Sequence, residues 1–486
     1  MKRKDRFFLT CICALALFFC VFRVKETYIL AEDVARDTLK ILTMWQNKEN
    51  TLIGPPASFS LTSDNKFYFG SFSYYLGLLG LLLSSFDPVG AAIPTIFLFI
   101  VSIPFFYRFC GNIQASKLVK VTATVLYGTS PLIISHMRFY WNPNPVIPLS
   151  VFFWYLVTLK NKKKVFEIYF PAGLVMAVIF NLHYFNALPM LIWTLIVMIR
   201  KNWDKIFGLI FGFFIGSLPL LIHEVTSEFS LTKALIENMG YIPEVPVTWL
   251  TVLGRMGEIF TAVLGLKHGE IYFPAIFGNK LPGFWLVWLL IFGLAILTII
   301  KNLKEKRVLL SIPLFITIIF AAIFSNTVFY ARYVFGAVPL VIWFLAEMFD
   351  GKIQRFLWIP VMISVIVATF GILIFQNSIS TGYIPVKILE KVSEAIVKDE
   401  FKGNYNLTEN IDVDGHALAL RYYVLRDSSN KPQGIGAYDR LDRVYVMAPS
   451  LERIRDENKF EYYASGPWKD PMVTDFGEIK LFRFDK

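Results

Sequence analysis

Long apolar runs separated by short polar breaks dominate the chain up to residue 376. A transmembrane helix needs about 20 mostly apolar residues, and about eleven runs approach that length. These candidate spans lie at about 7 to 23, 89 to 107, 119 to 136, 145 to 160, 165 to 183, 185 to 199, 204 to 223, 284 to 300, 308 to 324, 333 to 349 and 356 to 376. The pattern predicts a mainly α fold, a polytopic transmembrane helical bundle.

Lysine and arginine gather in alternate breaks between these runs. The basic breaks are Lys2 to Arg6, Arg108 to Lys120, Lys160 to Lys164, Arg200 to Lys205, Lys301 to Arg307 and Lys352 to Arg355. Short loops rich in basic residues stay cytoplasmic. We therefore predict a multi-pass cell-membrane protein with a cytoplasmic N-terminus, a retained first anchor, and an external face that carries the large first loop, 24–88, and the C-terminal tail.

One further apolar run, from Ser71 to Phe86, does not fit this alternation. We interpret it as a helix at the outer membrane surface. The alternative interpretation makes this run a span and residues 121–135 a non-spanning piece. That arrangement would place Arg108, Lys117 and Lys120 outside, so it is disfavoured.

The composition changes after the last span. Residues 377–486 are mixed and polar, with short apolar runs typical of strands at Leu418 to Leu425, Arg443 to Met447 and Ile479 to Phe484. They predict a small external α/β C-terminal domain. The domain assignment is therefore 1–376 for the transmembrane part, including loop 24–88, and 377–486 for the tail.

The overall composition agrees with a membrane protein. Hydrophobic residues make up 55% of the 486 residues and charged residues only 17%, which excludes an ordinary soluble domain. The net charge of +11 follows from the basic loops, so it does not indicate nucleic acid as a partner. The four cysteines match neither a zinc site nor a disulfide framework.

Ionisable and polar side chains gather on the predicted external side. His136, His183, His223 and His268 lie at external span ends or in an external loop, and His416 lies in the tail. The other members are Glu32, Asp33, Arg36, Asp37, Arg138, Asn142, Asn144, Glu224, Arg332 and Tyr333. Each could be a solvated or interfacial residue when taken singly. Together on one face they predict an external aqueous site, because ionisable groups at membrane depth are costly.

The order of motifs resembles that of bacterial membrane glycosyltransferases of the C-type fold, the relatives of protein O-mannosyltransferases and the lipid A aminoarabinose transferase. The motifs are Asp33-x-x-Arg-Asp37, Gly54-Pro-Pro-x-Ser58, Tyr74-Tyr75, Trp141-Asn-Pro-Asn144, Leu182-His-Tyr184 and Tyr330-Ala-Arg-Tyr333. The resemblance covers the membrane part and does not extend to the tail. It implies a sugar donor on a polyprenyl phosphate and inverting transfer on the external face.

The resemblance also implies roles for single residues. The acidic motif supplies the general base, which we assign to Asp33, with Asp37 as the second acidic position. Many relatives show Asp-Glu where this chain has Glu32-Asp33, so the choice of carboxylate stays open. The substrate-binding candidates are Glu32, Arg36, Tyr74, Arg138, Asn142, Asn144, His183, Tyr184, Arg332 and Tyr333.

The chemistry supports these assignments independently. Transfer of a sugar from a phosphate to a hydroxyl needs a carboxylate to take the proton and cations to stabilise the leaving phosphate. Arginine suits phosphate oxygens, which favours Arg138 and Arg332, with His183 and Tyr184 as further donors. No spacing demands a metal, so we predict metal-independent chemistry without a cofactor.

Two other functions stay open from the sequence. A polytopic transporter would also carry polar residues in its spans, although transporters place them near the bilayer midplane and show two similar halves. An envelope-glycan assembly protein without transferase activity is the other. The sugar, the prenyl length and the acceptor, whether lipid, polysaccharide or protein, cannot be read from the sequence.

Overall fold

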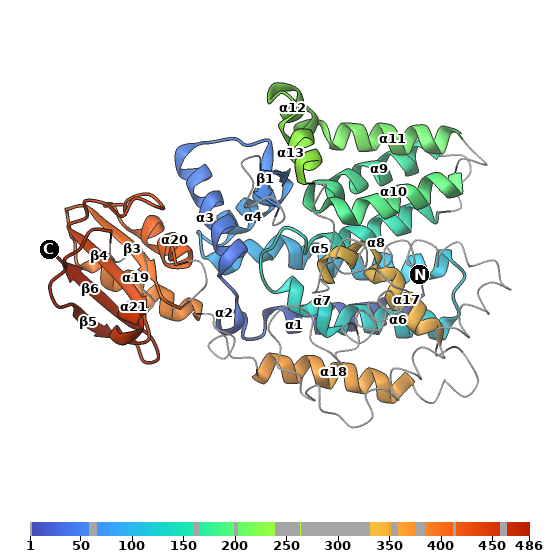
Figure 1. The fold of residues 1–486 in the computed structure, drawn as a ribbon. Coiled ribbons are helices and arrows are strands. Elements are labelled where there is room, and N and C mark those ends of the chain that lie inside the picture. Colours follow the sequence, from blue (N-terminus) through green and yellow to red (C-terminus); the bar gives the residue numbers. More distant parts are fainter. Residues whose placement is uncertain are drawn as a thin grey trace. The chain divides into compact units, whose positions relative to one another are not determined.

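The computed structural model describes residues 2–57, 66–159, 165–198, 203–238, 263, 331–348, 350, 358–375, 384–411, 415–456 and 464–486. Most of them are helical (Figure 1), which confirms the predicted mainly α fold. The helices are α1 (Arg3–Val21), α2 (Val24–Thr27), α3 (Glu32–Asn47), α4 (Phe72–Leu83), η2 (Pro88–Ala92), α5 (Ile93–Asn112), α6 (Lys117–Thr129), α7 (Pro131–Met137), α8 (Val146–Val157), α9 (Val165–Leu182), α10 (Tyr184–Met198), α11 (Trp203–Gly216), α12 (Leu218–Thr226), α13 (Ser230–Asn238), η3 (Ala331–Ala337), α17 (Val338–Met348), α18 (Trp358–Phe375), α19 (Val386–Lys398), α20 (Leu418–Asp427) and α21 (Leu451–Asp456). The strands are β1 (Ile53–Pro56), β2 (Tyr68–Gly70), β3 (Tyr405–Glu409), β4 (Arg443–Ala448), β5 (Met472–Asp475) and β6 (Lys480–Asp485).

Helices occupy the predicted spans wherever the structure describes them. The spans predicted at 284–300 and 308–324 lie outside the described residues. Within the described part, the 25-residue helical segment Pro88–Asn112 is long and apolar enough to cross a membrane by itself. The run from Ser71 to Phe86 forms α4, as expected. The number of spans, their direction and the surface position of α4 stay predictions.

Two predicted spans are bent pairs of helices rather than single straight ones. The run at 119–136 forms α6 and α7, which meet at an angle of 42°, and the run at 204–223 forms α11 and α12, which meet at 58°. A proline begins each second helix, because Pro131 and Pro219 occupy its first positions. Proline lacks the amide that would continue the preceding helix, so each bend has a local cause.

Contacts divide the chain into two compact units. Unit 1 comprises Met1–Phe22, Thr51–Tyr75 and Ala92–Phe375, and unit 2 comprises Arg23–Asn50, Leu76–Ala91 and Gln376–Lys486. Two segments of the first predicted external loop therefore pack with the tail. The domain boundaries derived from the sequence stay a prediction.

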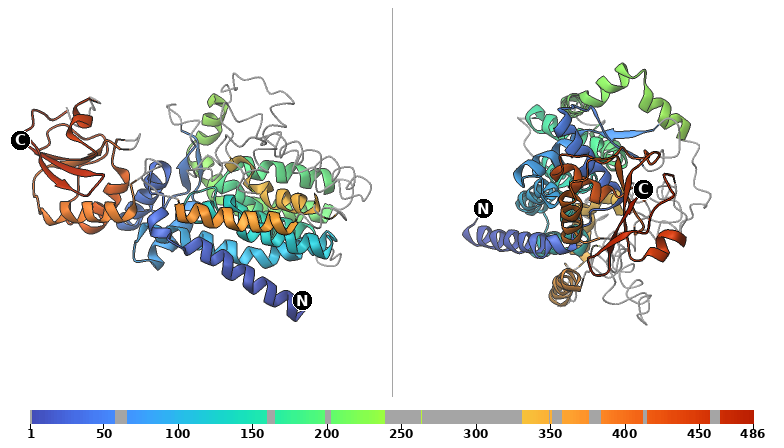
Figure 2. Two further views of the ribbon diagram at one scale, coloured as in Figure 1. Left: turned by 90° about the horizontal axis from the view of Figure 1, so that it is seen from below. Right: turned by 90° about the vertical axis from the view of Figure 1, so that its left-hand side faces the viewer.

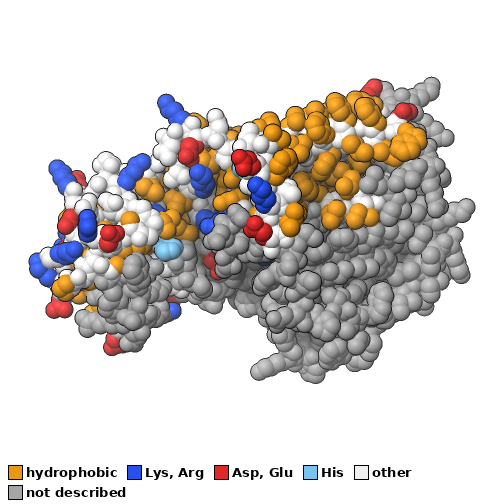
Figure 3. Space-filling model, turned by 45° about the horizontal axis from the view of Figure 1, so that its top comes forward, with side chains coloured by type: hydrophobic (Ala, Val, Ile, Leu, Met, Phe, Trp, Pro, Cys, Tyr) orange, Lys and Arg blue, Asp and Glu red, His pale blue; other side chains and the backbone are white. Residues whose placement is uncertain are grey.

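The helices of unit 1 pack closely around a large apolar core. Neighbouring helices α9, α10 and α11 run side by side (Figures 1 and 2). A Cβ atom at Gly212 would lie 2.1 Å from the Phe170 carbonyl oxygen, so glycine permits the close approach of α11 to α9. Outward-facing side chains of α11, among them Phe207, Ile210 and Phe214, form an apolar surface (Figure 3). Such a surface suits contact with lipid.

Unit 2 contains a four-stranded sheet in the order β3-β4-β6-β5. Strands β3 and β4 are parallel, and the other neighbours are antiparallel. Helix α19 lies along the sheet and packs on α20 (Figures 1 and 2). The strands predicted near Arg443 to Met447 and Ile479 to Phe484 are confirmed as β4 and β6, and so is the small α/β fold of the tail.

The strand predicted at Leu418 to Leu425 is wrong, because this run forms helix α20. All residues from Leu418 to Val424 are buried, so the run has neither the alternation of a strand nor the single apolar stripe of a surface helix. Leucine, alanine and arginine favour helix.

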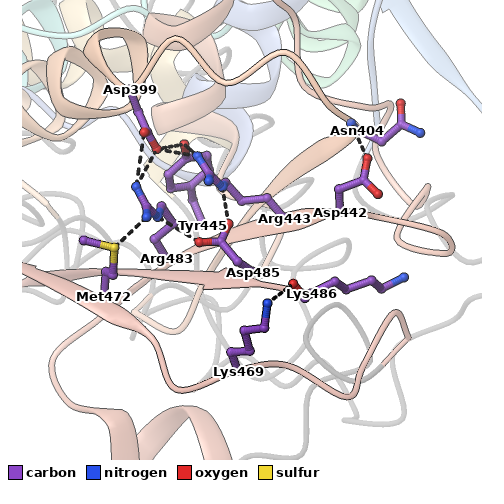
Figure 4. Close-up of polar contacts among 10 residues, drawn as sticks. All are labelled: Asp399, Asn404, Asp442, Arg443, Tyr445, Lys469, Met472, Arg483, Asp485 and Lys486. Carbon is purple, nitrogen blue, oxygen red and sulfur yellow. Dashed lines mark hydrogen bonds and ion pairs between the residues drawn. The ribbon is translucent and has the colours of Figure 1, made fainter.

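Charged side chains join α19 to the end of the sheet in unit 2. Asp399, directly after α19, accepts hydrogen bonds from Arg443 at 2.6 Å and Arg483 at 3.1 Å (Figure 4). Tyr445 also donates to Asp399, and Arg443 pairs with Asp485. The network aligns β4 and β6 with the end of α19, and its members are partly shielded from solvent.

Candidate functional site

The Leu182-His-Tyr184 motif lies where α9 ends and α10 begins, against the hairpin of β1 and β2. The Phe69 ring stacks on the rings of His183 and Tyr184, with 5.4 Å between centroids in both cases. The Tyr184 hydroxyl donates to the Tyr68 carbonyl oxygen at 2.6 Å. Gly70 permits this approach, because a Cβ there would lie 1.9 Å from the Asn181 amide oxygen.

Arg332 and Tyr333 begin η3 beside this motif. The Arg332 guanidinium carbon lies 5.1 Å from the centroid of the Trp141 ring and 5.6 Å from that of Tyr333. The Tyr333 ring meets His183 edge-on at 5.5 Å. Within the described part of the chain, Nδ1 of His183 is buried and has no hydrogen-bond partner. The structure thus brings three predicted site residues, His183, Arg332 and Tyr333, into one aromatic and cationic cluster.

The asparagines of Trp141-Asn-Pro-Asn144 hold this cluster together. Asn142 donates to the Leu182 carbonyl oxygen at 2.8 Å, next to His183. Asn144 donates to the Phe139 carbonyl oxygen at 2.9 Å, and its amide oxygen lies 3.1 Å from Nδ1 of His136. Both side chains are buried, so the bonds that the structure gives them are internal and place Trp141 beneath Arg332.

Arg138 and Tyr74 are also buried in unit 1. The Arg138 guanidinium donates to the carbonyl oxygens of Phe19, Cys20 and Phe22, where α1 ends. A cation at a helix C-terminus satisfies the last carbonyls and the helix dipole. Arg138 therefore has a structural role in capping the C-terminus of α1. Its assignment to the donor phosphate stays a prediction.

The acidic motif begins α3 in unit 2. Arg36 bridges its two aspartates, at 2.6 Å to Oδ1 of Asp33 and 2.8 Å to Oδ1 of Asp37. Glu32 is exposed, the Asp33 side chain is 35% exposed and Asp37 is completely buried. Among the described residues, Oδ2 of Asp37 has no hydrogen-bond partner. The first turn of a helix favours negative charge, which suits Glu32 and Asp33.

Burial raises the pKa of Asp37 from 3.8 to about 7, and the negative charge of Asp33 acts in the same direction, while Arg36 lowers it. The folded protein therefore holds this proton more tightly than the unfolded chain does. The resulting stabilisation is complete below pH 3.8 and is lost as the pH rises through about 7.

Replacement of Asp37 by Asn should remove this pH dependence. We expect the wild type to lose thermal stability relative to Asp37→Asn between pH 5 and pH 8. Melting temperatures of both detergent-purified proteins, followed by tryptophan fluorescence, measure the difference. If the melting temperatures of the two proteins differ by the same amount at pH 5 and at pH 8, the raised pKa of Asp37 is contradicted.

Sequence reasoning did not single out Asn186, which fixes the position of Arg332. The Asn186 amide donates to the Arg332 carbonyl oxygen at 2.8 Å and accepts from the Gly336 amide, also at 2.8 Å. This one buried side chain on α10 therefore holds η3 at both ends. A polar residue within an apolar span, two positions after Tyr184, is the only signal that could have indicated it.

Other predicted features can be placed only in part. Tyr330 and His268 lie outside the described residues. In the described ranges no three His, Cys, Asp or Glu side chains come close enough to hold a metal ion. The acidic motif belongs to unit 2 and the Arg332 cluster to unit 1, so their meeting in one site stays a prediction.

Comparison with known proteins identifies the fold. No known family profile matches the sequence, and no curated protein matches it either. Among solved structures, ArnT from Cupriavidus metallidurans bound to undecaprenyl phosphate aligns with a TM-score of 0.61 at 8% identity, over 100% of this chain and 98% of that one. The chain has the GT-C fold.

A second group of structures shares the GT-C fold. The Archaeoglobus fulgidus oligosaccharyltransferase in complex with Zn and sulfate aligns with a TM-score of 0.52 at 9% identity, over 96% of this chain and 72% of that one. The same enzyme tethered to an acceptor peptide aligns with a TM-score of 0.52 at 11% identity, over 92% of this chain and 69% of that one. The resemblance to this fold inferred from the motifs is therefore confirmed.

Proposed function

We propose that the protein is a membrane glycosyltransferase that moves a sugar from a polyprenyl-phosphate donor to an external acceptor. The observation that carries this proposal is the alignment of the whole chain with ArnT, a GT-C enzyme solved with undecaprenyl phosphate bound. The basic breaks and the apolar surface of α11 support a membrane location, with the active site and C-terminal domain external.

The Arg332 cluster is the proposed donor-phosphate site. The planar guanidinium can bind two phosphate oxygens while its face rests on the Trp141 ring. His183 contributes Nδ1, which is buried without a partner in the described part of the chain. Tyr333 and Tyr184 complete an aromatic wall, which suits a sugar ring and the start of a prenyl chain. Positive charge on Arg332 stabilises the leaving phosphate as the bond to the sugar breaks.

Asp33 is the proposed general base. Its carboxylate is partly exposed and is held by Arg36, whereas Asp37 is buried and the pair shares the same guanidinium. Asp33 takes the acceptor hydroxyl proton while the acceptor oxygen attacks the anomeric carbon. The carbon–oxygen bond to phosphate breaks on the opposite face, and polyprenyl phosphate leaves with the electron pair. The sugar is transferred with inversion of its configuration.

Photo-cross-linking tests the donor class. We expect a photoreactive polyprenyl phosphate to label the purified protein and to be displaced by unlabelled polyprenyl phosphate. A polyprenol of the same length should compete at least about 10-fold more weakly, because hydrogen bonds to a charged group contribute about 1.5–3 kcal/mol. Equal competition by the two lipids would contradict a phosphate-binding site.

Replacement of Asn186 should weaken donor binding through Arg332. Asn186→Leu removes both bonds to η3, so we expect the donor Kd to rise about 10-fold. Asn186→Asp keeps an acceptor for the Gly336 amide and should give an intermediate value. Thr194→Val is the matched control, since Thr194 is buried on the same helix and donates to the Met190 carbonyl oxygen at 2.6 Å. Equal Kd values for Asn186→Leu and Thr194→Val would rule out this positioning role.

A further inference from the structure

The end of the acidic helix is attached to the C-terminal tail. Gln46, near the end of α3, donates to the Leu425 carbonyl oxygen of α20 at 3.0 Å. The neighbouring Trp45 ring lies 6.0 Å from the Phe86 ring, measured between centroids. The Phe86 carbonyl oxygen accepts from the Tyr422 hydroxyl of α20 at 2.9 Å. All these residues belong to unit 2.

The corner that carries Phe86 also receives support from neighbouring elements. Ser85 and Phe86 both have positive φ angles, 54° and 63°, which are unfavourable for residues other than glycine. Besides Tyr422, the Arg426 guanidinium lies 3.4 Å from the Phe86 carbonyl oxygen. Lys25 forms an ion pair at 2.6 Å with Asp87, the next residue. The tail therefore holds the corner against which Trp45 packs.

Helix α20, which makes these contacts, is itself well packed. Its residues from Leu418 to Val424 are buried, and it packs against both α19 and α3. Tyr422 itself is 0% exposed. A side chain fixed in this way holds its hydroxyl in one position, because every rotation is opposed by close packing.

Helix α3 connects its contact with α20, at Gln46, to the carboxylate of Asp33 at its other end. Asp33 lies thirteen positions before Gln46, which corresponds to about 20 Å along an α-helix. A tilt of about 3° at the anchored end would move Asp33 by roughly 1 Å, and a displacement of that size can slow a reaction about 100-fold. Small changes at α20 are thus magnified at the acidic motif.

We propose that α20 of the C-terminal tail is a positioning element for the acidic motif, in which Tyr422 and Leu425 hold α3 through Phe86 and Gln46. The tail thereby sets the orientation of Asp33. Its contribution to catalysis rests on the proposed transferase function, whereas the control of α3 by α20 does not.

Two tyrosines of the tail provide a matched test. Tyr422→Phe removes the hydroxyl that supports Phe86. Tyr405→Phe removes a hydroxyl that donates at 2.7 Å to the carbonyl oxygen of Asn430, within the tail, and Tyr405 is 4% exposed. Each variant loses one partly buried hydrogen bond, so we expect similar decreases in melting temperature for the full-length protein. Gln46→Ala, at an exposed residue, gives a second variant that removes the hydrogen bond from α3 to the Leu425 carbonyl oxygen.

Hydrogen exchange of the full-length protein in detergent measures how often the backbone amides of α3 are exposed to solvent. We expect exchange in α3 to accelerate about 3- to 10-fold in Tyr422→Phe and Gln46→Ala, and less than twofold in Tyr405→Phe. Equal exchange of α3 in Tyr422→Phe and Tyr405→Phe would overturn the proposal, whether or not the protein transfers sugar.

Kinetics then measure the consequence for the proposed reaction. We expect kcat to fall about 3- to 10-fold in Tyr422→Phe while the donor KM stays within twofold, because the donor-phosphate residues are unchanged. Tyr405→Phe should keep both constants within twofold of the wild type. An unchanged kcat for Tyr422→Phe with accelerated exchange would overturn the catalytic part of the proposal.

Discussion

Replacement of Asp33 by Asn should abolish sugar transfer while leaving the protein folded. The amide has nearly the same shape but cannot take the proton from the acceptor hydroxyl, and a general base contributes about 10²- to 10⁴-fold. We therefore expect kcat to fall by that factor, with little change in donor binding. Initial rates of transfer and the donor Kd, measured on the same preparation, separate the two effects.

Glu49→Gln is the matched control for this change. Glu49 lies just after the same helix, α3, and pairs at 2.9 Å with Lys40. Its replacement also removes one carboxylate and one exposed ion pair, whose contribution to stability is small. We expect transfer to stay within twofold of the wild type. Retained activity in Asp33→Asn would move the base to Asp37 or Glu32.

Replacement of Arg332 by Ala should raise the donor Kd about 10- to 100-fold. The guanidinium is the cation of the proposed phosphate site, and charge-assisted hydrogen bonds contribute about 1.5–3 kcal/mol. Arg332→Lys keeps the charge but loses the planar face that lies over Trp141, so we expect an intermediate Kd. Competition between labelled and unlabelled polyprenyl phosphate gives the affinity of each variant.

Arg108→Lys provides the corresponding control. Arg108 also lies over an aromatic ring, with its guanidinium carbon 5.8 Å from the Phe105 centroid, but it belongs to a predicted cytoplasmic break. We expect no change in donor affinity for this variant. An Arg332→Ala protein with wild-type affinity would remove Arg332 from the phosphate site.

The long apolar runs predicted the helices of unit 1 well. A stretch such as Ile93–Asn112 is apolar over its whole length, so its identity as a helix depends on no distant contact. The bends at Pro131 and Pro219 coincide with prolines in the sequence, although the apolar runs at 119–136 and 204–223 each predict a single span. Helix α20 was misassigned because burial on every side removes the periodicity by which helix and strand are distinguished.

The candidate site could be predicted as a set of residues but not as a geometry. The preference of arginine for phosphate pointed to both Arg138 and Arg332, and only the structure shows that the first closes α1. The bond from Asn186 to η3 joins residues about 150 positions apart, and no local pattern encodes such a contact. The attachment of α3 to α20 could not be predicted from the sequence either, because it depends on the backbone carbonyl oxygen of Phe86.

The most direct measurement is transfer of a radiolabelled sugar from polyprenyl phosphates by the purified protein, with membrane extract as the source of acceptors. Transfer separates an enzyme from a polytopic transporter or an assembly protein, because only an enzyme breaks the bond between sugar and phosphate. We predict labelled product and free polyprenyl phosphate with the wild type, and neither with Asp33→Asn. Folded wild-type protein that binds the lipid but neither transfers nor releases sugar from any donor would contradict the glycosyltransferase assignment.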